Sequence, residues 1–186
     1  MASNPAPGEL ELVRAFVNTW DADEGTESIP GPAELRDWLV AHDLVDADTR
    51  VSAADHRQAI EVREALRALL LQNAGLDVGS DAGAALDAAA RRARLGVRFA
   101  PDGGVRTQAE AGGVAGALGR LLAVVAAAQE EGTWTRLKAC LADDCQWAYY
   151  DLSRNRSAVW CDMASCGNRQ KVRSYRERHH PHALRD

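Results

Sequence analysis

The spacing of apolar residues predicts two helices near the start of the chain. Between residues 10 and 17, apolar side chains recur three and four positions apart, which places them on one helical face. A stretch rich in Asp, Glu, Gly and Ser follows, and its composition is typical of a loop that ends near Pro30. Pro32 then suits the first turn of a second helix, whose apolar face includes Leu35 and Leu39.

A third, longer helix is predicted from residue 53 to about Asn73. Ser52 and Asp55 have the spacing of a capping box, in which each side chain bonds the backbone N–H of the other residue. The leucines of this segment are expected to face a core, whereas Arg63 and Arg67 are expected to face water.

The following segments predict one further helix, a β-hairpin and a returning helix. Residues 81–94 have helical character, and residues 113–131 form a second, strongly apolar segment. Between them, residues 95–100 and 105–108 alternate in polarity and are joined by Pro-Asp-Gly-Gly at 101–104, which is a turn sequence. The expected fold is therefore mainly α with a small β-hairpin.

Gly132 and Thr133 are expected to join a helical domain, residues 1–132, to a C-terminal module, residues 133–186. The two parts differ in charge. Residues 136–186 hold ten Lys or Arg against six Asp or Glu, whereas residues 1–135 hold twelve against twenty-one. An acidic body with a basic end favours a nucleic-acid contact at that end, although basic tails also serve solubility alone.

The composition, with 46% hydrophobic and 26% charged residues, is that of a folded globular protein. The first twenty residues lack a basic start followed by an apolar core, so no signal peptide is expected. The longest apolar stretch, residues 114–128, is interrupted by glycines and Arg120 and is too short for a membrane span. We therefore expect a cytoplasmic protein without a membrane partner.

Four cysteines give the strongest chemical signal. Cys140 and Cys145 make one Cys-x4-Cys pair, Cys161 and Cys166 make another, and fifteen residues separate the pairs. This spacing predicts four thiolate ligands of one structural zinc ion, a closed shell that leaves no position for substrate. Two disulfides and a redox site are the alternatives. Disulfides are disfavoured in a reducing cytosol, and a redox site normally has a Cys-x2-Cys motif.

The sequence around these cysteines resembles a known family. Residues 136–171, above all Cys166-Gly167-Asn168-Arg169, are similar to the CGNR zinc finger, which is named after that tetrapeptide. Three earlier segments are similar to the ABATE domain, which usually precedes this finger in bacterial proteins proposed to be stress-induced transcription regulators. These segments are Phe-Val-Asn-Thr at 16–19, Leu-Arg-Asp-Trp-Leu at 35–39 and Arg-Glu-Ala-Leu-Arg at 63–67.

The resemblance implies that the four cysteines bind zinc and that the protein binds DNA. We therefore expect a treble-clef-like or ribbon-like finger that holds one structural Zn²⁺. One departure lies just before Trp160, where family members commonly carry further arginines and this chain has Ala158 and Val159. Weaker phosphate binding is expected as a result.

Basic residues follow the last cysteine on a predicted helix, where Arg169, Arg173 and Arg176 fall on one stripe. Such a stripe can contact DNA phosphates, although it is also compatible with an ordinary solvated helix end. The candidate nucleic-acid contacts are Arg154, Arg156, Arg169, Lys171, Arg173, Arg176 and Arg178. A second stripe, expected to pack on the finger, consists of Val172, Tyr175 and His179.

Other residues of the module have expected structural roles. Gly167 lets the chain turn closely after the last ligand, and Asn168 is expected to cap the helix that begins there. Asp151 is expected to form an ion pair with Arg154 or Arg156. The finger's small apolar core is expected to consist of Trp147, Tyr149 and Trp160.

The leading functional hypothesis is a DNA-binding transcription regulator, in which the helical domain senses a small-molecule ligand or forms a homodimer. The alternative is a zinc-stabilised protein–protein interaction module without direct DNA contact. An enzyme, with a pocket near Trp20 and Trp38, is the third class considered. We expect no enzymatic activity, because no nucleophile and base pair is recognisable in the sequence.

Overall fold

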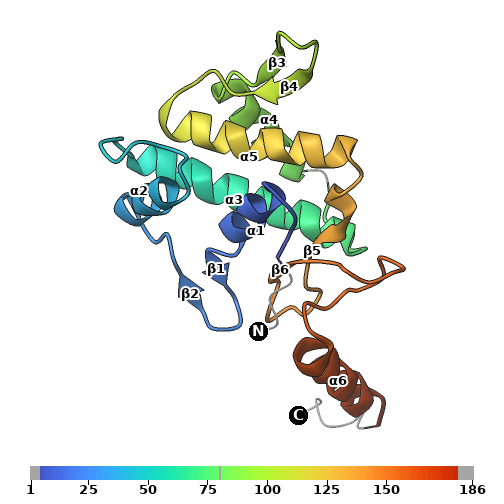
Figure 1. Cartoon of the computed structure of the whole chain (residues 1–186). Helices are drawn as coiled ribbons and strands as arrows, with labels where there is room; N and C mark the ends of the chain where they lie inside the picture. Colours follow the sequence, from blue (N-terminus) through green and yellow to red (C-terminus); the bar gives the residue numbers. More distant parts are fainter. Residues whose placement is uncertain (1–4, 80, 180–186) are drawn as a thin grey trace.

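The computed structural model describes residues 5–79 and 81–179 of the chain (Figure 1). Its elements in chain order are α1 (Leu10–Val17), β1 (Trp20–Asp21), β2 (Thr26–Glu27), α2 (Pro32–Ala41), α3 (Ala53–Asn73), α4 (Asp81–Arg92), β3 (Gly96–Phe99), β4 (Val105–Gln108), α5 (Gly113–Glu130), η1 (Trp134–Arg136), β5 (Leu137–Ala139), β6 (Ala148–Tyr150), η2 (Met163–Gly167) and α6 (Asn168–His179). The expected class, mainly α with short antiparallel strand pairs, is confirmed.

Helices α3 and α5 form the centre of the body, with α1, α2 and α4 packed around them (Figure 1). Helix α5 consists almost entirely of small and apolar residues, and half of it is buried. By length and composition it is the one helix, within the described ranges, that could cross a membrane. In this fold it contacts α1, α3, α4 and β4, as a core helix does.

The predicted start of α3 is confirmed. The backbone N–H of Asp55 donates to Ser52 Oγ at 3.1 Å, and the N–H of Ser52 donates to Asp55 Oδ2 at 2.9 Å. This capping box satisfies two backbone donors that would otherwise lack partners at the helix start. A local sequence pattern therefore fixed this boundary correctly.

The prediction that Arg63 and Arg67 face water is wrong, because both side chains are buried. Arg67 donates to the carbonyl oxygens of Val17 at 2.7 Å and Gln146 at 2.9 Å, and it pairs with Glu64. Burial lowers the pKa of Arg67, although Glu64 acts in the opposite direction. The guanidinium thus joins α3 to the end of α1 and to the loop between β5 and β6.

The polar loop after α1 contains a short hairpin that the sequence did not predict. Strands β1 and β2 pair antiparallel, and Asp21 Oδ1 accepts the backbone N–H groups of Asp23 and Glu24 at the turn. The hairpin is attached to the body because Arg63 Nη1 contacts Glu27 Oε1 at 2.8 Å.

The β3–β4 hairpin is confirmed, with Gly96 opposite Gln108 and Phe99 opposite Val105. It packs on α5 through β4 (Figure 1). Among the described residues this sheet has two strands, so one edge of β4 is not paired with a strand there.

The first part of the C-terminal module shares the core of the helical body. Trp134, Leu137 and Tyr150 are buried in the same hydrophobic cluster as the residues of α1, α3 and α5. Asn18 pairs with Ala148 through two hydrogen bonds of 2.9 and 2.7 Å. The segment 133–186 is therefore continuous with the body at its beginning, and its last residues, 180–186, lie outside the described ranges.

Replacing Arg67 by Met should lower the free energy of unfolding by about 3–5 kcal/mol. The methionine keeps an apolar stem but leaves the Val17 and Gln146 carbonyls without their donor. Urea denaturation of the zinc-loaded protein measures the change. As a control, Arg36→Met removes an exposed pair with Asp37 and should cost less than about 1 kcal/mol. Equal losses in the two variants would contradict a bridging role for Arg67.

Candidate metal centre and basic helix

The four cysteines come from two local structures that the fold brings together. Cys140 follows β5 and Cys145 lies in the β5–β6 connection, where the N–H of Cys145 bonds the Ala142 carbonyl at 2.9 Å. Cys161 and Cys166 stand at the start of the last helical segment, before and within η2. Two ligands thus come from a β-hairpin knuckle and two from a helix start, which is a treble-clef-like arrangement.

The sulfur atoms have the spacing of a tetrahedral metal site. All four lie within 4.8 Å of one another, and Cys161 Sγ is 3.6 Å from the sulfurs of both Cys145 and Cys166. Zinc–sulfur bonds of about 2.3 Å at tetrahedral angles place two sulfurs about 3.8 Å apart. A disulfide needs about 2.05 Å, so the disulfide alternative does not fit these pairs.

The four sulfurs are close enough to shift one another's pKa values. Hydrogen bonds from Cys145 and Cys161 lower the pKa of Cys140 to about 2. Donating to Cys140 raises the pKa of Cys145 to about 12 and also raises the pKa of Cys161. One thiolate therefore disfavours the ionisation of its neighbours, and a bound divalent cation would offset this repulsion.

Comparison with protein families places this geometry in context. The model of the CGNR zinc finger matches residues 136–179, and the ABATE model, described as "Putative stress-induced transcription regulator", matches residues 10–131. The chain belongs to the ABATE family. A search of curated proteins found no match. The finger match and the four clustered sulfurs together identify one structural zinc ion, held by Cys140, Cys145, Cys161 and Cys166.

The residue that caps the last helical segment of the CGNR finger is Asp162, so the expectation that Asn168 is the cap is wrong. Asp162 Oδ1 accepts the N–H of Ala164 at 2.9 Å, whereas Asn168 is already helical and donates to the Ala164 carbonyl at 3.1 Å. A Cβ added at Gly167 would lie 2.8 Å from Met163 Sδ, the end of a flexible and exposed side chain that can move aside. The Cys-Gly-Asn-Arg tetrapeptide thus continues a helical segment that began three residues earlier, at Met163.

The ion pair of Asp151 is formed with Lys138, so the expected pair with Arg154 or Arg156 is wrong. Lys138 Nζ lies 2.8 Å from Asp151 Oδ2, and both side chains are buried. Burial alone would raise the pKa of Asp151, but hydrogen bonds from Lys138 and Ser153 outweigh it and lower the pKa. Lys138 also donates to the carbonyls of Arg156 and Ala158, at 2.6 and 3.0 Å, which fixes the loop between the cysteine pairs.

The aromatic core of the finger is as expected. Tyr149 is buried, Trp147 and Trp160 pack partly buried against the cysteines, and Tyr149 Oη donates to the Ala158 carbonyl at 2.9 Å. The second stripe of α6 does not pack on this core. Val172 and Tyr175 are at least half exposed, and Tyr175 stacks on His179 of the same helix.

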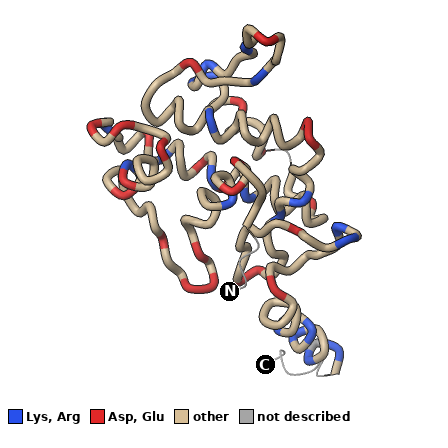
Figure 2. The backbone as a smooth tube through the Cα atoms, in the orientation of Figure 1, with Lys and Arg blue, Asp and Glu red and all other residues tan. Residues whose placement is uncertain are grey.

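Arg169 is held between the zinc site and the helical body. Its Nη2 donates to Cys166 Sγ at 3.2 Å, and its Nη1 lies 2.7 Å from Asp23 Oδ1 and 3.7 Å from Asp144 Oδ2. These contacts, with Asp23 first, raise the pKa of Arg169. Figure 2 shows the acidic β1–β2 loop and the basic helix α6 at the same end of the molecule.

The remaining basic candidates divide into two groups. Arg173 lies 3.8 Å from Asp143 Oδ2, and Arg176 lines the same hollow of about 740 Å³ as Arg169 and Asp23. Lys171 and Arg178 are exposed on the same helix. Arg154 and Arg156 are exposed in the loop between the cysteine pairs, outside α6. The structure therefore gathers five of the seven on one helix.

The third functional class considered, an enzyme, would have its pocket near Trp20 and Trp38. Trp38 packs against Phe16 and stacks on His42, with ring centroids 3.9 Å apart in the stacked pair. A groove of about 730 Å³ lies instead along α5, between β4 and the segment after α2. The sequence offered no signal for it, because its wall combines residues from distant segments.

Removing zinc should release the distal half of the finger while leaving its hairpin on the body. Chelation or Cys161→Ser removes an interaction worth on the order of 10 kcal/mol in small fingers. Hydrogen exchange should lose protection over residues 158–179 and keep it at 137–139 and 148–150, which pack in the body core. Protection that is lost equally at both sets of residues would contradict this division. Elemental analysis should give one zinc per chain.

Arg169→Ala should weaken zinc binding by about 10–100-fold, because the guanidinium stabilises the Cys166 thiolate from outside the ligand shell. Competition with a chromophoric chelator measures the change in zinc affinity. Lys171→Ala removes a nearby charge from an exposed position and should leave zinc affinity unchanged. A similar loss in both variants would indicate a general charge effect instead.

Proposed function

We propose that the protein is a cytoplasmic transcription regulator that binds DNA through α6 of the CGNR finger. The family description supports regulation of transcription, and its reference to stress suggests the condition under which the protein acts. Regulation of transcription by DNA binding needs no catalytic step. A zinc site with four cysteine ligands suits this role, because its closed shell leaves no position for a substrate.

The observation that carries the proposal is the basic face of α6, which the zinc cluster anchors. Arg169, Arg173 and Arg176 line one hollow, and the helix extends away from the body (Figure 1). Basic side chains on an exposed helix can neutralise phosphates, and such contacts supply most of the affinity for DNA.

The three arginines have different roles in this proposal. Arg169 holds Cys166 and Asp23, so its first task is to keep the helix in place. Arg173 and Arg176 lie further from the metal and are exposed, so they are proposed to make the phosphate contacts. DNA must also compete with the carboxylate of Asp23, which lines the same hollow.

The helical body is proposed to control the finger, either by binding a small molecule or by forming a homodimer. Control is mechanically direct in this fold. Helix α5 continues through η1 into β5, and β5 packs on α3 and leads to Cys140.

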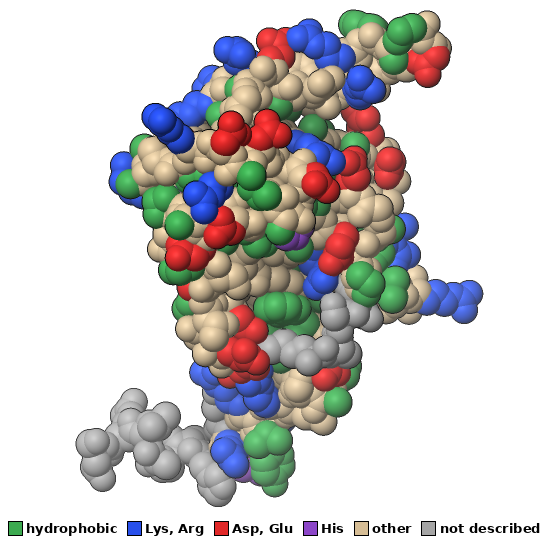
Figure 3. All heavy atoms as spheres, turned by 60° about the vertical axis from the view of Figure 1, so that its left-hand side comes forward, with side chains coloured by type: hydrophobic (Ala, Val, Ile, Leu, Met, Phe, Trp, Pro, Cys, Tyr) green, Lys and Arg blue, Asp and Glu red, His purple; other side chains and the backbone are tan. Residues whose placement is uncertain are grey.

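One observation favours a second candidate, a protein–protein interaction module. Val172 and Tyr175 are exposed on α6, and Met163 and Leu152 are exposed on neighbouring parts of the finger. Basic and hydrophobic side chains meet at this end of the molecule (Figure 3). A protein partner could cover such a mixed surface as well as DNA.

Replacing Arg173 and Arg176 together by Gln should weaken binding to a generic DNA duplex and lower the slope of log K against log salt by about 2. Fluorescence anisotropy over a salt series measures both quantities. The matched control is Arg91→Gln, which removes one exposed arginine from α4. It should change neither affinity nor slope.

The possible outcomes separate the two candidates. Wild-type protein that fails to bind DNA at low salt would favour the interaction module. Binding that is unchanged in the double variant, with zinc retained, would move the DNA surface away from α6.

A further inference from the structure

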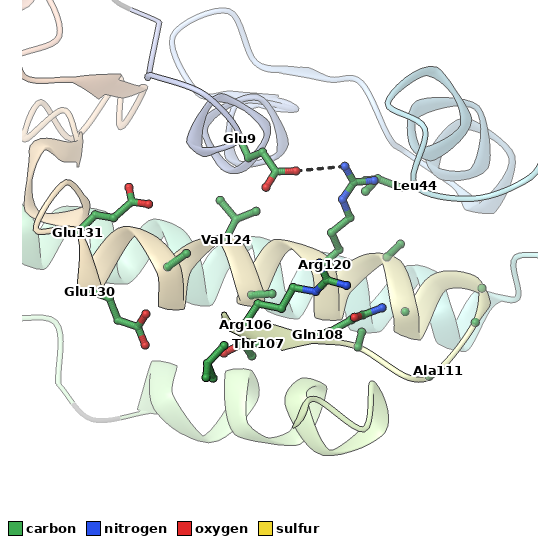
Figure 4. Close-up of a pocket in the computed structure, with 18 residues that line it drawn as sticks. Glu9, Leu44, Arg106, Thr107, Gln108, Ala111, Arg120, Val124, Glu130 and Glu131 are labelled. Atoms are coloured by element: carbon green, nitrogen blue, oxygen red, sulfur yellow. Dashed lines mark hydrogen bonds and ion pairs between the residues drawn. The ribbon is translucent and has the colours of Figure 1, made fainter. Parts of the chain in front are cut away.

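The groove along α5 combines an apolar floor with two arginines at its rim (Figure 4). Its volume of about 730 Å³ is in the range of small-molecule sites. The apolar lining comes from Leu44, Ala117, Ala123, Val124 and Ala127. Small side chains on α5 leave this space, and a loop closes one end, where a Cβ on Gly116 would lie 2.1 Å from the Ala111 carbonyl oxygen.

Arg106 is available to a ligand. It is exposed on β4, and its side chain makes no hydrogen bond or ion pair with residues 5–79 or 81–179. Its cross-strand neighbour Arg98 pairs with Glu110, so the carboxylate of Glu110 is already engaged. Figure 4 shows Arg106 extending along the face of α5 towards Gln108.

Arg120 can also turn to a ligand. Its Nη2 lies 3.2 Å from Glu9 Oε1, and its Nη1 donates to the Asp43 carbonyl at 3.2 Å. Both side chains of the Arg120–Glu9 pair are about half exposed or more. An exposed pair of this kind contributes roughly 0–1 kcal/mol, so a ligand carboxylate can displace Glu9 at little cost.

The opposite end of the groove carries negative charge. Glu130 and Glu131 line the groove at the C-terminal end of α5. Glu130 follows Arg120 by ten residues, which corresponds to about 15 Å along the helix. A second anionic group at that end of a ligand would face two carboxylates. Charge repulsion at that end would therefore disfavour a ligand that carries an acid at each end.

We propose that this groove binds an organic acid with a single carboxylate and an apolar body. The carboxylate contacts Arg106 and Arg120, and the apolar body lies on Ala123, Val124 and Ala127. This deepens the proposed function, because it names the class of ligand that the helical body senses. The ligand would act near the end of α5 that leads into η1 and the zinc knuckle.

The test compares two ten-carbon acids on the zinc-loaded full chain by isothermal titration calorimetry. Decanoate should bind, and decanedioate, which has a second carboxylate, should bind at least tenfold more weakly. Arg106→Gln with Arg120→Gln should weaken decanoate at least tenfold, whereas Arg91→Gln should have no effect. Glu130→Gln with Glu131→Gln should strengthen decanedioate specifically and narrow the difference between the two acids.

The outcomes are decisive and independent of DNA. Absence of decanoate binding, or binding that survives the double arginine variant, would overturn the proposal. Equal affinity for the two acids would show that the glutamates do not select and would overturn the single-carboxylate claim. Decanoate binding by a protein that does not bind DNA would uphold the groove and reject the proposed regulator.

Discussion

Four sulfurs within 4.8 Å of one another impose the constraint on which the C-terminal part of the fold depends. As thiolates they carry four negative charges, and a zinc ion removes only two of them. The remaining charge accounts for the position of Arg169, whose guanidinium contacts Cys166. That arginine in turn draws Asp23 and Asp144 towards the metal centre. A chain of alternating charges thus begins at the metal and ends in the acidic loop of the body.

The finger does not depend on its metal alone. Its own cluster contains few buried residues besides the cysteines, too small a core to be stable by itself. Strands β5 and β6 therefore place Leu137 and Tyr150 in the core of the body. Arg67 adds a polar contact between the body and the finger, because it donates a hydrogen bond to the Gln146 carbonyl in the β5–β6 connection. The family boundary near residue 132 separates two sequence patterns, while the hydrophobic core runs across it.

Local patterns predicted the elements well, and non-local contacts explain the errors. The capping box at Ser52, the β3–β4 turn and the cysteine spacing depend on neighbours in sequence, so they could be read directly. Arg67 looked like a solvent-facing residue because its partners, two carbonyl oxygens, lie 50 and 79 positions away. Asp151 pairs with Lys138 rather than with Arg154 or Arg156 for a similar reason. The pairing of β5 with β6 brings the side chains of Lys138 and Asp151 together.

The candidate site shows the same division. The metal ligands were predictable from the spacing of the cysteines. Which arginines can contact DNA phosphates depends on the fold, because the fold places acidic side chains beside some of them. Helical periodicity placed Arg169 and Arg173 on one face correctly, but it carried no information about Asp23 in a distant hairpin. Residues that line the α5 groove are scattered from Glu9 to Glu131, and no local motif links them.

The contact between Asp23 and Arg169 has a consequence for how the protein would respond to ionic strength. Added salt screens this internal pair and any phosphate contact made by the same helix at the same time. Salt weakens the contact between Arg169 and Asp23 while it also weakens the contacts of α6 with DNA phosphates. Release of Asp23 therefore offsets part of the loss of DNA affinity. The acidic β1–β2 loop would then reduce the salt dependence of DNA binding. The slope of log K against log salt would indicate fewer phosphate contacts than the number of arginines that touch the DNA.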